Sequence, residues 1–309
     1  MNMPLIPATD ATEALRRLPR PALWVLAARL KTLALSITPV LAGTWLAARE
    51  GNWRADILVA AMASAAAIQI GTNLWNDAAD AQSGVDSGER LGPPRMTALG
   101  LLDAGQVRKA AAAAFGLAAL AGLFLASVGG WPIVVIGLAS LLLGFLYSMG
   151  PYPLSATPVG ELLVIAFFGV VAVAATTWLH GSPLTGDVLW TGMFLGLPAA
   201  SVLLVNNHRD RVGDERNGRR TLAILIGEGA SRVLFSLFNL AALTGLLWIH
   251  GICRENALAI AAVAIFALFL SRRMSVLPVS RALNGVLALT ALYQLALLAV
   301  FALSDLLCL

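Results

Sequence analysis

Long apolar segments, separated by shorter polar stretches, run through this chain from about residue 22 to residue 305. Most of them approach the roughly 20 residues that an α-helix needs to cross the hydrocarbon core of a bilayer. This pattern predicts an all-α, polytopic membrane protein with about nine transmembrane helices around a central cavity. The predicted spans are approximately residues 22–48, 55–76, 108–127, 132–149, 159–179, 188–207, 232–250, 256–271 and 283–305.

The composition agrees with this pattern. Hydrophobic residues make up 59% of the 309-residue chain and charged residues only 12%, whereas a soluble domain carries about 25% charged residues. We therefore expect residues 1–309 to form a single transmembrane domain. Residues 1–20 are a polar segment with Arg16, Arg17 and Arg20 immediately before the first apolar run, and this segment is too polar for a signal peptide.

Positive charges are distributed unequally between the two ends of the predicted helices. Lys and Arg concentrate in cytoplasmic loops of membrane proteins, which places the N-terminus and the loops near 77–107, 208–231 and 272–282 on the cytoplasmic side. After nine spans of the inner (cytoplasmic) membrane, the C-terminus is predicted on the far side. The cytoplasmic loops and their flanks hold Arg90, Arg95, Arg108, Lys109, Arg209, Arg211, Arg216, Arg219, Arg220, Arg272, Arg273 and Arg281, and the opposite loops hold Arg49, Arg54 and Arg254.

The formal net charge of +4 reflects this bias. The chain has no basic face with interleaved aromatic residues, so we expect no nucleic-acid partner. Its two cysteines, Cys253 and Cys308, are far apart and lie in or beside apolar segments. We interpret them as small buried residues rather than as a disulfide or a metal site. The sequence predicts no particular oligomeric state.

Two acidic clusters stand at the ends of apolar segments. The first cluster contains Asn73, Asp77 and Asp80, and the second contains Asn206, Asn207, Arg209, Asp210 and Asp214. In each cluster an amide and two carboxylates follow a spacing of three, four and seven residues, which places them on one face of a helix. A carboxylate inside a bilayer costs roughly 2.5–3.5 kcal/mol or more. Two such clusters therefore indicate a shared function.

Carboxylate and amide oxygens on two opposed helix faces would make an oxygen-rich site. Hard oxygen ligands select Mg²⁺ over Zn²⁺, and Mg²⁺ is typically held by a few carboxylates together with substrate phosphates. Arg matches phosphate oxygens in a bidentate manner, and Lys acts as a point charge. Candidate cations for a diphosphate are Arg29, Lys31, Arg90, Arg95 and Arg209. The pattern therefore predicts a Mg²⁺–diphosphate site.

Single carboxylates also have a simpler interpretation. An Asp at a cytoplasmic helix end can be solvated or paired with a nearby Arg, which applies to isolated residues such as Asp86 and Asp103. Glu161 begins a span after Gly160, and two roles remain open for it: a charge at a helix N-terminus or a ligand in a polar cavity. The repeated arrangement and the cost of charge in a membrane favour a functional role for the two clusters.

The motifs around these clusters resemble those of the UbiA superfamily of intramembrane prenyltransferases, and most of all its branch that acts on 1,4-dihydroxy-2-naphthoate in menaquinone biosynthesis. The resemblance extends along most of the chain and is carried by residues 28–33, 76–86, 90–97, 147–154, 160–161, 206–223 and 227. The chain departs from the family pattern at Leu30, where the family usually has Pro, and at Ala78 and Ala79, where it usually has aromatic residues. Smaller side chains there would widen the cavity.

The resemblance implies a UbiA-type fold and Mg²⁺-dependent transfer of a polyprenyl group from polyprenyl diphosphate to an aromatic acceptor, 1,4-dihydroxy-2-naphthoate, with loss of CO₂. It implies two Mg²⁺ ions that bridge the diphosphate, with the catalytic residues Asp77, Asp80, Asp210 and Asp214 and the amide of Asn73 as ligands. It implies substrate contacts from Asn73, Arg29, Lys31, Arg90, Arg95, Tyr147, Asn206, Asn207 and Arg209. The polyprenyl chain would lie between helices and enter from membrane lipid.

Other functions remain open at this point. A different aromatic acceptor, such as 4-hydroxybenzoate or homogentisate, or a terpene cyclase without an acceptor, would use the same motifs. A cation-coupled membrane transporter would also carry intramembrane carboxylates, but such sites lie at helix breaks near the bilayer midplane. The carboxylates of this chain lie at helix ends beside Arg-rich loops, which favours the prenyltransferase.

Overall fold

The computed structural model describes residues 13–83, 91–146 and 153–307, without the side chains of residues 80–83 and 305–307. Every regular element in these residues is a helix, which confirms the all-α prediction. Eight described helical segments are long and apolar enough to cross a membrane, and α6 is a shorter apolar helix where a ninth span is predicted. The chain is therefore a multi-pass membrane protein.

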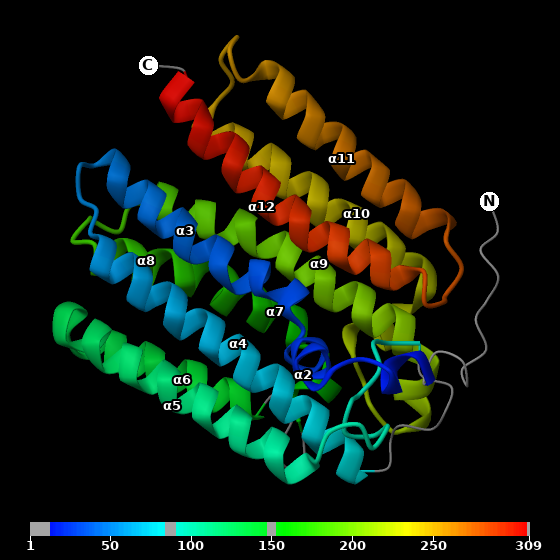
Figure 1. Cartoon of the computed structure of the whole chain (residues 1–309). Coiled ribbons are helices and arrows are strands. Elements are labelled where there is room, and N and C mark those ends of the chain that lie inside the picture. The colour runs from blue at the N-terminus through cyan, green and yellow to red at the C-terminus, as the bar shows by residue number, and fades with distance from the viewer. Residues whose placement is uncertain (1–12, 84–90, 147–152, 308–309) are drawn as a thin grey trace.

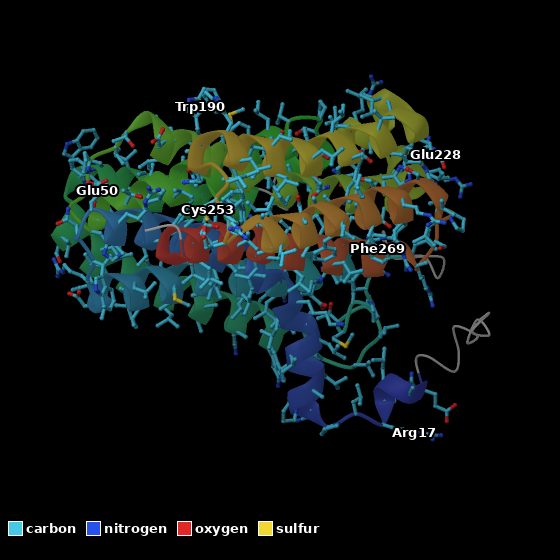
Figure 2. All side chains as sticks on the ribbon, turned by 90° about the horizontal axis from the view of Figure 1, so that it is seen from above. Arg17, Glu50, Trp190, Glu228, Cys253 and Phe269 are labelled. Atoms are coloured by element: carbon cyan, nitrogen blue, oxygen red, sulfur yellow. The ribbon has the colours of Figure 1, made fainter. Side chains whose placement is uncertain are left out.

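The long helices run side by side along one common direction and form a single bundle, whereas the short helix α2 projects away from it (Figure 1 and Figure 2). In chain order the described elements are α2 (Arg20–Ala28), η1 (Leu30–Thr32), α3 (Leu33–Arg49), α4 (Ala55–Ser83), α5 (Ala104–Gly129), α6 (Trp131–Leu146), η2 (Leu154–Ala156), α7 (Gly160–Ile165), η3 (Ala166–Val171), α8 (Ala172–Leu179), α9 (Gly186–Arg216), α10 (Leu222–His250), α11 (Ala257–Val276) and α12 (Leu283–Leu307). The segment η3 is a π-helical turn inside the span that begins with α7.

Helix α9 forms the centre of the bundle. It packs against α7, α10 and α12. Of the residues in its most apolar 18-residue stretch 72% are buried, compared with 17% in α5. The largest apolar cluster joins α9 to the helices around it. Large apolar side chains such as Leu120, Leu138 and Leu258 are exposed on the outer helices, as expected of surfaces that face lipid.

Both acidic clusters lie within helices. Helix α4 continues to Ser83 and α9 to Arg216, beyond the predicted span ends at residues 76 and 207. Hydropathy marks the point where a segment leaves the apolar layer, but a helix can continue into water while its backbone hydrogen bonds remain intact. Helix α10 likewise starts at Leu222, ten residues before the predicted span, and is interrupted at Gly227, whose φ is 79°.

The predicted span over residues 22–48 matches the candidate membrane span Arg20–Arg49, but within it the helix is broken between α2 and α3. Arg29 follows α2 with φ 52°, a left-handed conformation that costs an L-residue roughly 1–2 kcal/mol. Asn73 of α4 bridges the break, because its Nδ2 donates to the carbonyl of Ala28 at 2.9 Å and to Thr32 Oγ1 at 3.0 Å. The break is therefore held in place by a side chain of the first acidic cluster.

The cysteine prediction is wrong. Cys253, in the turn after α10, is disulfide-bonded; the other cysteine of the chain, Cys308, lies outside the described residues. Nearby, Asn256 Nδ2 donates to Ser304 Oγ at 2.8 Å. Helix α12 thus returns to the turn after α10, and this proximity is not visible in a sequence where 48 residues separate the two.

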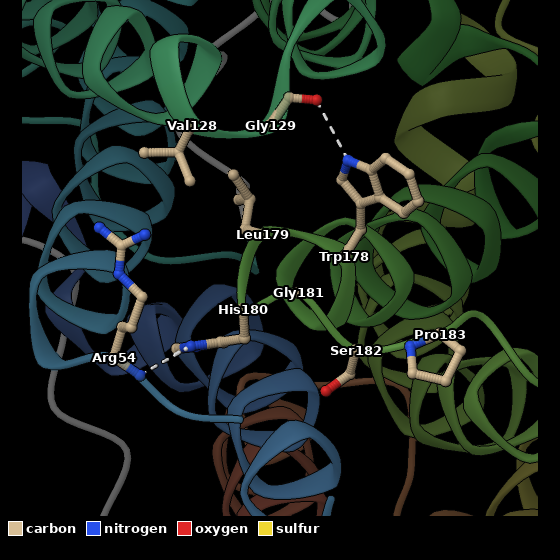
Figure 3. A pocket seen from close by; sticks show the side chains of 9 residues that line it. All are labelled: Arg54, Val128, Gly129, Trp178, Leu179, His180, Gly181, Ser182 and Pro183. Atoms are coloured by element: carbon tan, nitrogen blue, oxygen red, sulfur yellow. Dashed lines mark hydrogen bonds between the residues drawn. The ribbon is translucent and has the colours of Figure 1, made fainter. Parts of the chain in front are cut away.

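The two ends of the bundle carry different polar groups. Figure 2 shows Glu50 and Glu228 at opposite ends of the molecule. A pocket of about 510 Å³ opens at the Glu50 end, beside Arg54, Trp178 and His180 (Figure 3). Asp77 lies about 33 Å farther along α4 at 1.5 Å per residue, so this pocket is separate from the acidic clusters.

Candidate active site

The polypeptide between α4 and α5 folds back onto the first acidic cluster. We refer to its residues 91–102 as the strap. The Met96 N–H donates to Asp77 Oδ2 at 3.0 Å, and the Thr97 N–H donates to Asp77 Oδ1 at 3.0 Å. The Thr97 hydroxyl lies 2.6 Å from the same Oδ1. Both carboxylate oxygens of Asp77, which is 1% exposed, are therefore engaged by the strap.

The strap is also anchored by apolar packing. Met96 is fully buried in a cluster with Leu74 and Ala78 of α4. A compact turn follows, in which Leu101 N–H donates to the Met96 carbonyl, and Gly100 supplies a φ of 66° that favours glycine. Ala78 is fully buried in the same cluster as Met96, and the wider cavity expected from Ala78 and Ala79 stays a prediction.

Arg209 is the centre of the second cluster. Its side chain is fully buried and makes four hydrogen bonds, so that four of its five N–H donors are used. Nε and Nη2 form a fork with the two oxygens of Asp210, at 2.9 and 2.5 Å. Nη2 also donates to Asn206 Oδ1 at 2.8 Å, and Nη1 donates to Asn284 Oδ1 at 2.6 Å. Arg209 therefore fixes the direction of the Asp210 carboxylate.

Asn284 joins the two clusters. It lies at the start of α12, and its Nδ2 donates to the Leu91 carbonyl of the strap at 3.1 Å. Because its Oδ1 accepts from Arg209, a hydrogen-bonded path leads from Asp210 through Asn284 into the strap and on to Asp77. Sequence reasoning did not select Asn284; an amide at the polar end of an apolar helix is the signal that could have identified it.

Glu161 is the polar residue whose role the sequence left open. It lies in the first turn of α7, is 2% exposed, and accepts a hydrogen bond from Asn207 Nδ2 to Oε1 at 2.9 Å. Its Oε2 is buried without a hydrogen-bond partner among the described residues. The contact places a carboxylate beside the second cluster, as a cavity ligand would require. Its neighbour His208, on the same turn of α9 as Asn207, is also fully buried.

The remaining predicted site residues are less closely associated. Asp214 pairs with Arg219 at 3.2 Å in the turn that ends α9. Lys31 is exposed, whereas Arg95 is 7% exposed within the strap. Arg90, Tyr147 and the side chain of Asp80 lie outside the described part of the chain.

The predicted metal ligands are not tested by the described side chains. Among these, no three His, Cys, Asp or Glu groups come close enough together to hold a metal ion, and Asp80 is not one of them. The amide nitrogen of Asn73 serves the helix break, and the oxygens of Asp77 serve the strap. The two-ion site stays a prediction.

Comparisons with known proteins agree with the fold and the motifs. Residues 36–284 match the UbiA prenyltransferase family. The chain is 36% identical over 228 residues to the 1,4-dihydroxy-2-naphthoate octaprenyltransferase of Mycobacterium tuberculosis, covering 73% of this chain and 76% of that protein. It is 32% identical over 250 residues to the enzyme of the same name from Bacillus subtilis, covering 81% and 78%.

The fold has solved counterparts. The structure of a UbiA homolog from Archaeoglobus fulgidus bound to GPP and Mg²⁺ superposes with a TM-score of 0.62 at 16% identity, and covers 90% of this chain and 99% of that one. At this identity the likeness concerns the fold alone. The family match over most of the chain, with relatives above 30% identity, shows that this protein belongs to the UbiA prenyltransferase family.

Proposed function

We propose that this protein transfers a polyprenyl group from polyprenyl diphosphate to 1,4-dihydroxy-2-naphthoate in a Mg²⁺-dependent reaction that releases CO₂. The observation that carries the acceptor assignment is the likeness to proteins named 1,4-dihydroxy-2-naphthoate octaprenyltransferase, which extends over about three quarters of the chain. The hydrogen-bonded path between the two acidic clusters supports a single reaction centre at that end of the bundle.

The donor set suits Mg²⁺. Helix α9 offers the carboxylates of Asp210 and Asp214, and α4 carries Asp80 one turn after Asp77; carboxylate oxygens are hard ligands. Each oxygen of Asp210 accepts one N–H from Arg209 and retains lone pairs for a metal. We propose that Asp77, Asp80, Asp210 and Asp214, with the amide oxygen of Asn73, hold Mg²⁺. When bound, Mg²⁺ would stabilise the negative charge that develops on the leaving diphosphate.

The cationic residues of the chain would bind the remaining diphosphate oxygens. We propose that three residues bind the diphosphate: Arg95 in the strap, and Arg29 and Lys31 at the helix break. Four N–H donors of Arg209 are already hydrogen-bonded within the protein. We therefore propose that Arg209 orients Asp210 and does not bind the diphosphate. A pre-oriented carboxylate needs no rearrangement when charge develops, which is the main source of electrostatic catalysis.

The proposed reaction balances without an oxidant. The allylic C–O bond of the donor breaks, and its electron pair leaves with diphosphate. The ring carbon that bears the carboxylate then forms the new C–C bond. The bond from this carbon to the carboxylate breaks, its electrons restore the aromatic ring, and CO₂ departs.

The deciding experiment supplies membranes that contain the protein with a defined polyprenyl diphosphate, Mg²⁺ and 1,4-dihydroxy-2-naphthoate labelled in its carboxylate. We expect labelled CO₂ and diphosphate in equal amounts, and a lipid product whose mass lacks the carboxylate. Parallel reactions with 4-hydroxybenzoate and homogentisate serve as acceptor controls, and Asp210→Asn as the inactive control. Faster turnover of either control acceptor would reject the naphthoate assignment.

We further propose that the strap end of the bundle faces the cytoplasm. Arg and Lys are concentrated in the loops at that end. The oxidised Cys253 lies at the opposite end, where an extracytoplasmic, oxidising compartment would allow a disulfide. A reporter enzyme that is active only in the periplasm should be active when it is fused after Leu309. Activity of the same reporter inserted at Pro94 of the strap would contradict the proposed orientation.

A further inference from the structure

We propose that Glu161 is the base of the prenyl transfer: its carboxylate accepts the proton of the acceptor hydroxyl that stands beside the attacked ring carbon. This inference rests on the function proposed above, because it names the residue that activates the acceptor of that reaction. The sequence left two roles open for Glu161, and its surroundings in the folded chain favour contact with a ligand.

The first argument is the incomplete hydrogen bonding of the Glu161 carboxylate, which is 2% exposed. Oε1 accepts one hydrogen bond, from the neutral amide of Asn207 at 2.9 Å. Oε2 is buried without a hydrogen-bond partner among the described residues, and no Lys or Arg in that part of the chain pairs with the carboxylate. A buried carboxylate needs donors or an opposite charge, so Oε2 is suited to accept from a bound ligand.

The second argument is the position of this carboxylate relative to the second acidic cluster. Asn207 precedes Asp210 by three residues on α9, about 4.5 Å along the helix axis, and lies on the same helix face. The segment before α7 is fixed to the far end of α9, because the Arg220 N–H donates to the Ala156 carbonyl at 2.8 Å. Glu161 is therefore held beside the carboxylate that we propose for Mg²⁺.

The third argument is the kind of ligand that this carboxylate can accept. It repels a diphosphate, and its partner Asn207 is neutral. It also stands apart from a cation site, because Glu161, Asp210 and Asp214 all have described side chains and do not form a group of three that could hold a metal. A phenolic O–H, by contrast, forms a short and strong hydrogen bond to an anionic oxygen. The hydroxyl of the acceptor is therefore the matching donor.

Proton transfer to Glu161 needs no further reactant. As the ring carbon attacks the allylic cation, the neighbouring O–H bond breaks, its proton passes to Glu161, and its electron pair forms a carbonyl. When CO₂ leaves, the electrons of the broken C–C bond restore the aromatic ring, and the carbonyl oxygen takes the proton back. Glu161 thus ends as the carboxylate with which it began. A positioned base of this kind typically accelerates a reaction by about 10²–10⁴-fold.

The test compares Glu161→Gln with the wild type in membranes supplied with saturating donor, acceptor and Mg²⁺. Gln has nearly the same shape and keeps an acceptor for Asn207, but its amide cannot take up the proton. We expect kcat to fall by about a hundredfold, with an unchanged half-saturating Mg²⁺ concentration. The thermal unfolding midpoint should be unchanged or higher, because a buried charge is removed. The matched control is Glu50→Gln at the opposite end of the bundle, which should turn over like the wild type.

A second readout is recovery of the variant at high pH, measured without oxygen. Phenols ionise near pH 10, and an ionised acceptor needs no base, so the turnover of Glu161→Gln should rise toward that of the wild type between about pH 7 and pH 9.5. Turnover at pH 7 within about threefold of the wild type would overturn the proposal. A loss without recovery at high pH, or with a raised Mg²⁺ requirement or a lowered unfolding midpoint, would also overturn it.

The comparison uses whichever aromatic acceptor the wild type turns over fastest. Rejection of 1,4-dihydroxy-2-naphthoate as the acceptor would therefore leave the test of Glu161 intact, and the two proposals can fail separately.

Discussion

At the scale of single residues, this protein uses charged side chains to fix other polar groups inside an apolar bundle. Arg209 has a fully buried side chain yet is surrounded by one carboxylate and two amide oxygens. A buried charge is tolerated only when it is paired and hydrogen-bonded. The amide nitrogen of Asn73 donates to the helix break, and the role of its oxygen as a metal ligand stays a prediction. Residue type and spacing indicated that these positions matter, but not which neighbour each would contact.

Arg209→Lys tests whether the guanidinium fork is required. A lysine ammonium cannot reach Asp210, Asn206 and Asn284 together, and leaving buried partners unpaired costs about 1–3 kcal/mol for each group. We expect prenyl transfer to fall by about a hundredfold and the thermal unfolding midpoint in detergent to decrease. The control is Arg211→Lys. Arg211 also lies on α9 and pairs with the partly exposed Glu228 at 3.5 Å. Equal behaviour of the two variants would contradict the assignment.

At the scale of elements, the position of the second cluster depends on close backbone packing between η3 and α9. A Cβ on Gly169 would lie 2.4 Å from the Gly192 carbonyl oxygen and 2.8 Å from the Gly196 Cα. Small residues at such crossings let transmembrane helices approach each other. The same span carries Glu161, so this approach brings its carboxylate to Asn207 of α9. Long polar motifs can be located in the sequence, whereas the partner of a glycine cannot.

Gly169→Ala tests this crossing. The added methyl group would collide with backbone, which cannot move aside as a flexible side chain does, and we expect a loss of about 1–3 kcal/mol in stability. The measurement is thermal unfolding in detergent, with prenyl transfer followed in parallel. Gly122→Ala on α5 is the matched control, because nothing lies within 4 Å of its Cβ position. A Gly169→Ala midpoint as high as that of the control would disprove the crossing.

At the scale of the whole molecule, the strap and the second cluster lie at one end, while a separate polar network ties the helices at the other. There the Arg54 N–H donates to His180 Nδ1 at 3.1 Å, and His180 Nε2 lies 3.1 Å from Thr44 Oγ1. The network joins α3, the start of α4 and the loop after α8. Burial, assisted by the Arg54 charge, lowers the pKa of His180 below its usual value. Folding therefore favours the neutral form of the ring.

This network predicts a pH dependence of stability. A lowered folded pKa means that the unfolded chain, in which the His pKa is about 6.5, binds the proton more readily. The contribution of His180 is complete above pH 6.5 and is lost as the pH falls below that value toward the folded pKa. We expect the unfolding midpoint of the wild type to fall more steeply between pH 7.5 and pH 5 than that of His180→Gln. Parallel curves for the two proteins would refute this prediction.

The sequence alone determined the all-helical membrane architecture, the approximate spans and the positions of the two acidic clusters. These features are local: each follows from about 20 apolar residues in a row or from carboxylates repeated at helical spacing. Hydropathy could not reveal the break at Arg29 or the continuation of α4 and α9 beyond their apolar parts, since polar residues can remain helical.

Only the tertiary structure decided what the polar side chains contact. Asp77 is separated from Met96 and Thr97 by about 20 residues, and Leu91 from Asn284 by 193; no local pattern connects such partners. The reason is physical: a buried donor or acceptor must be satisfied by whatever group the packed helices bring within reach. Contacts with α4 and α12 therefore determined that the strap joins the two acidic clusters.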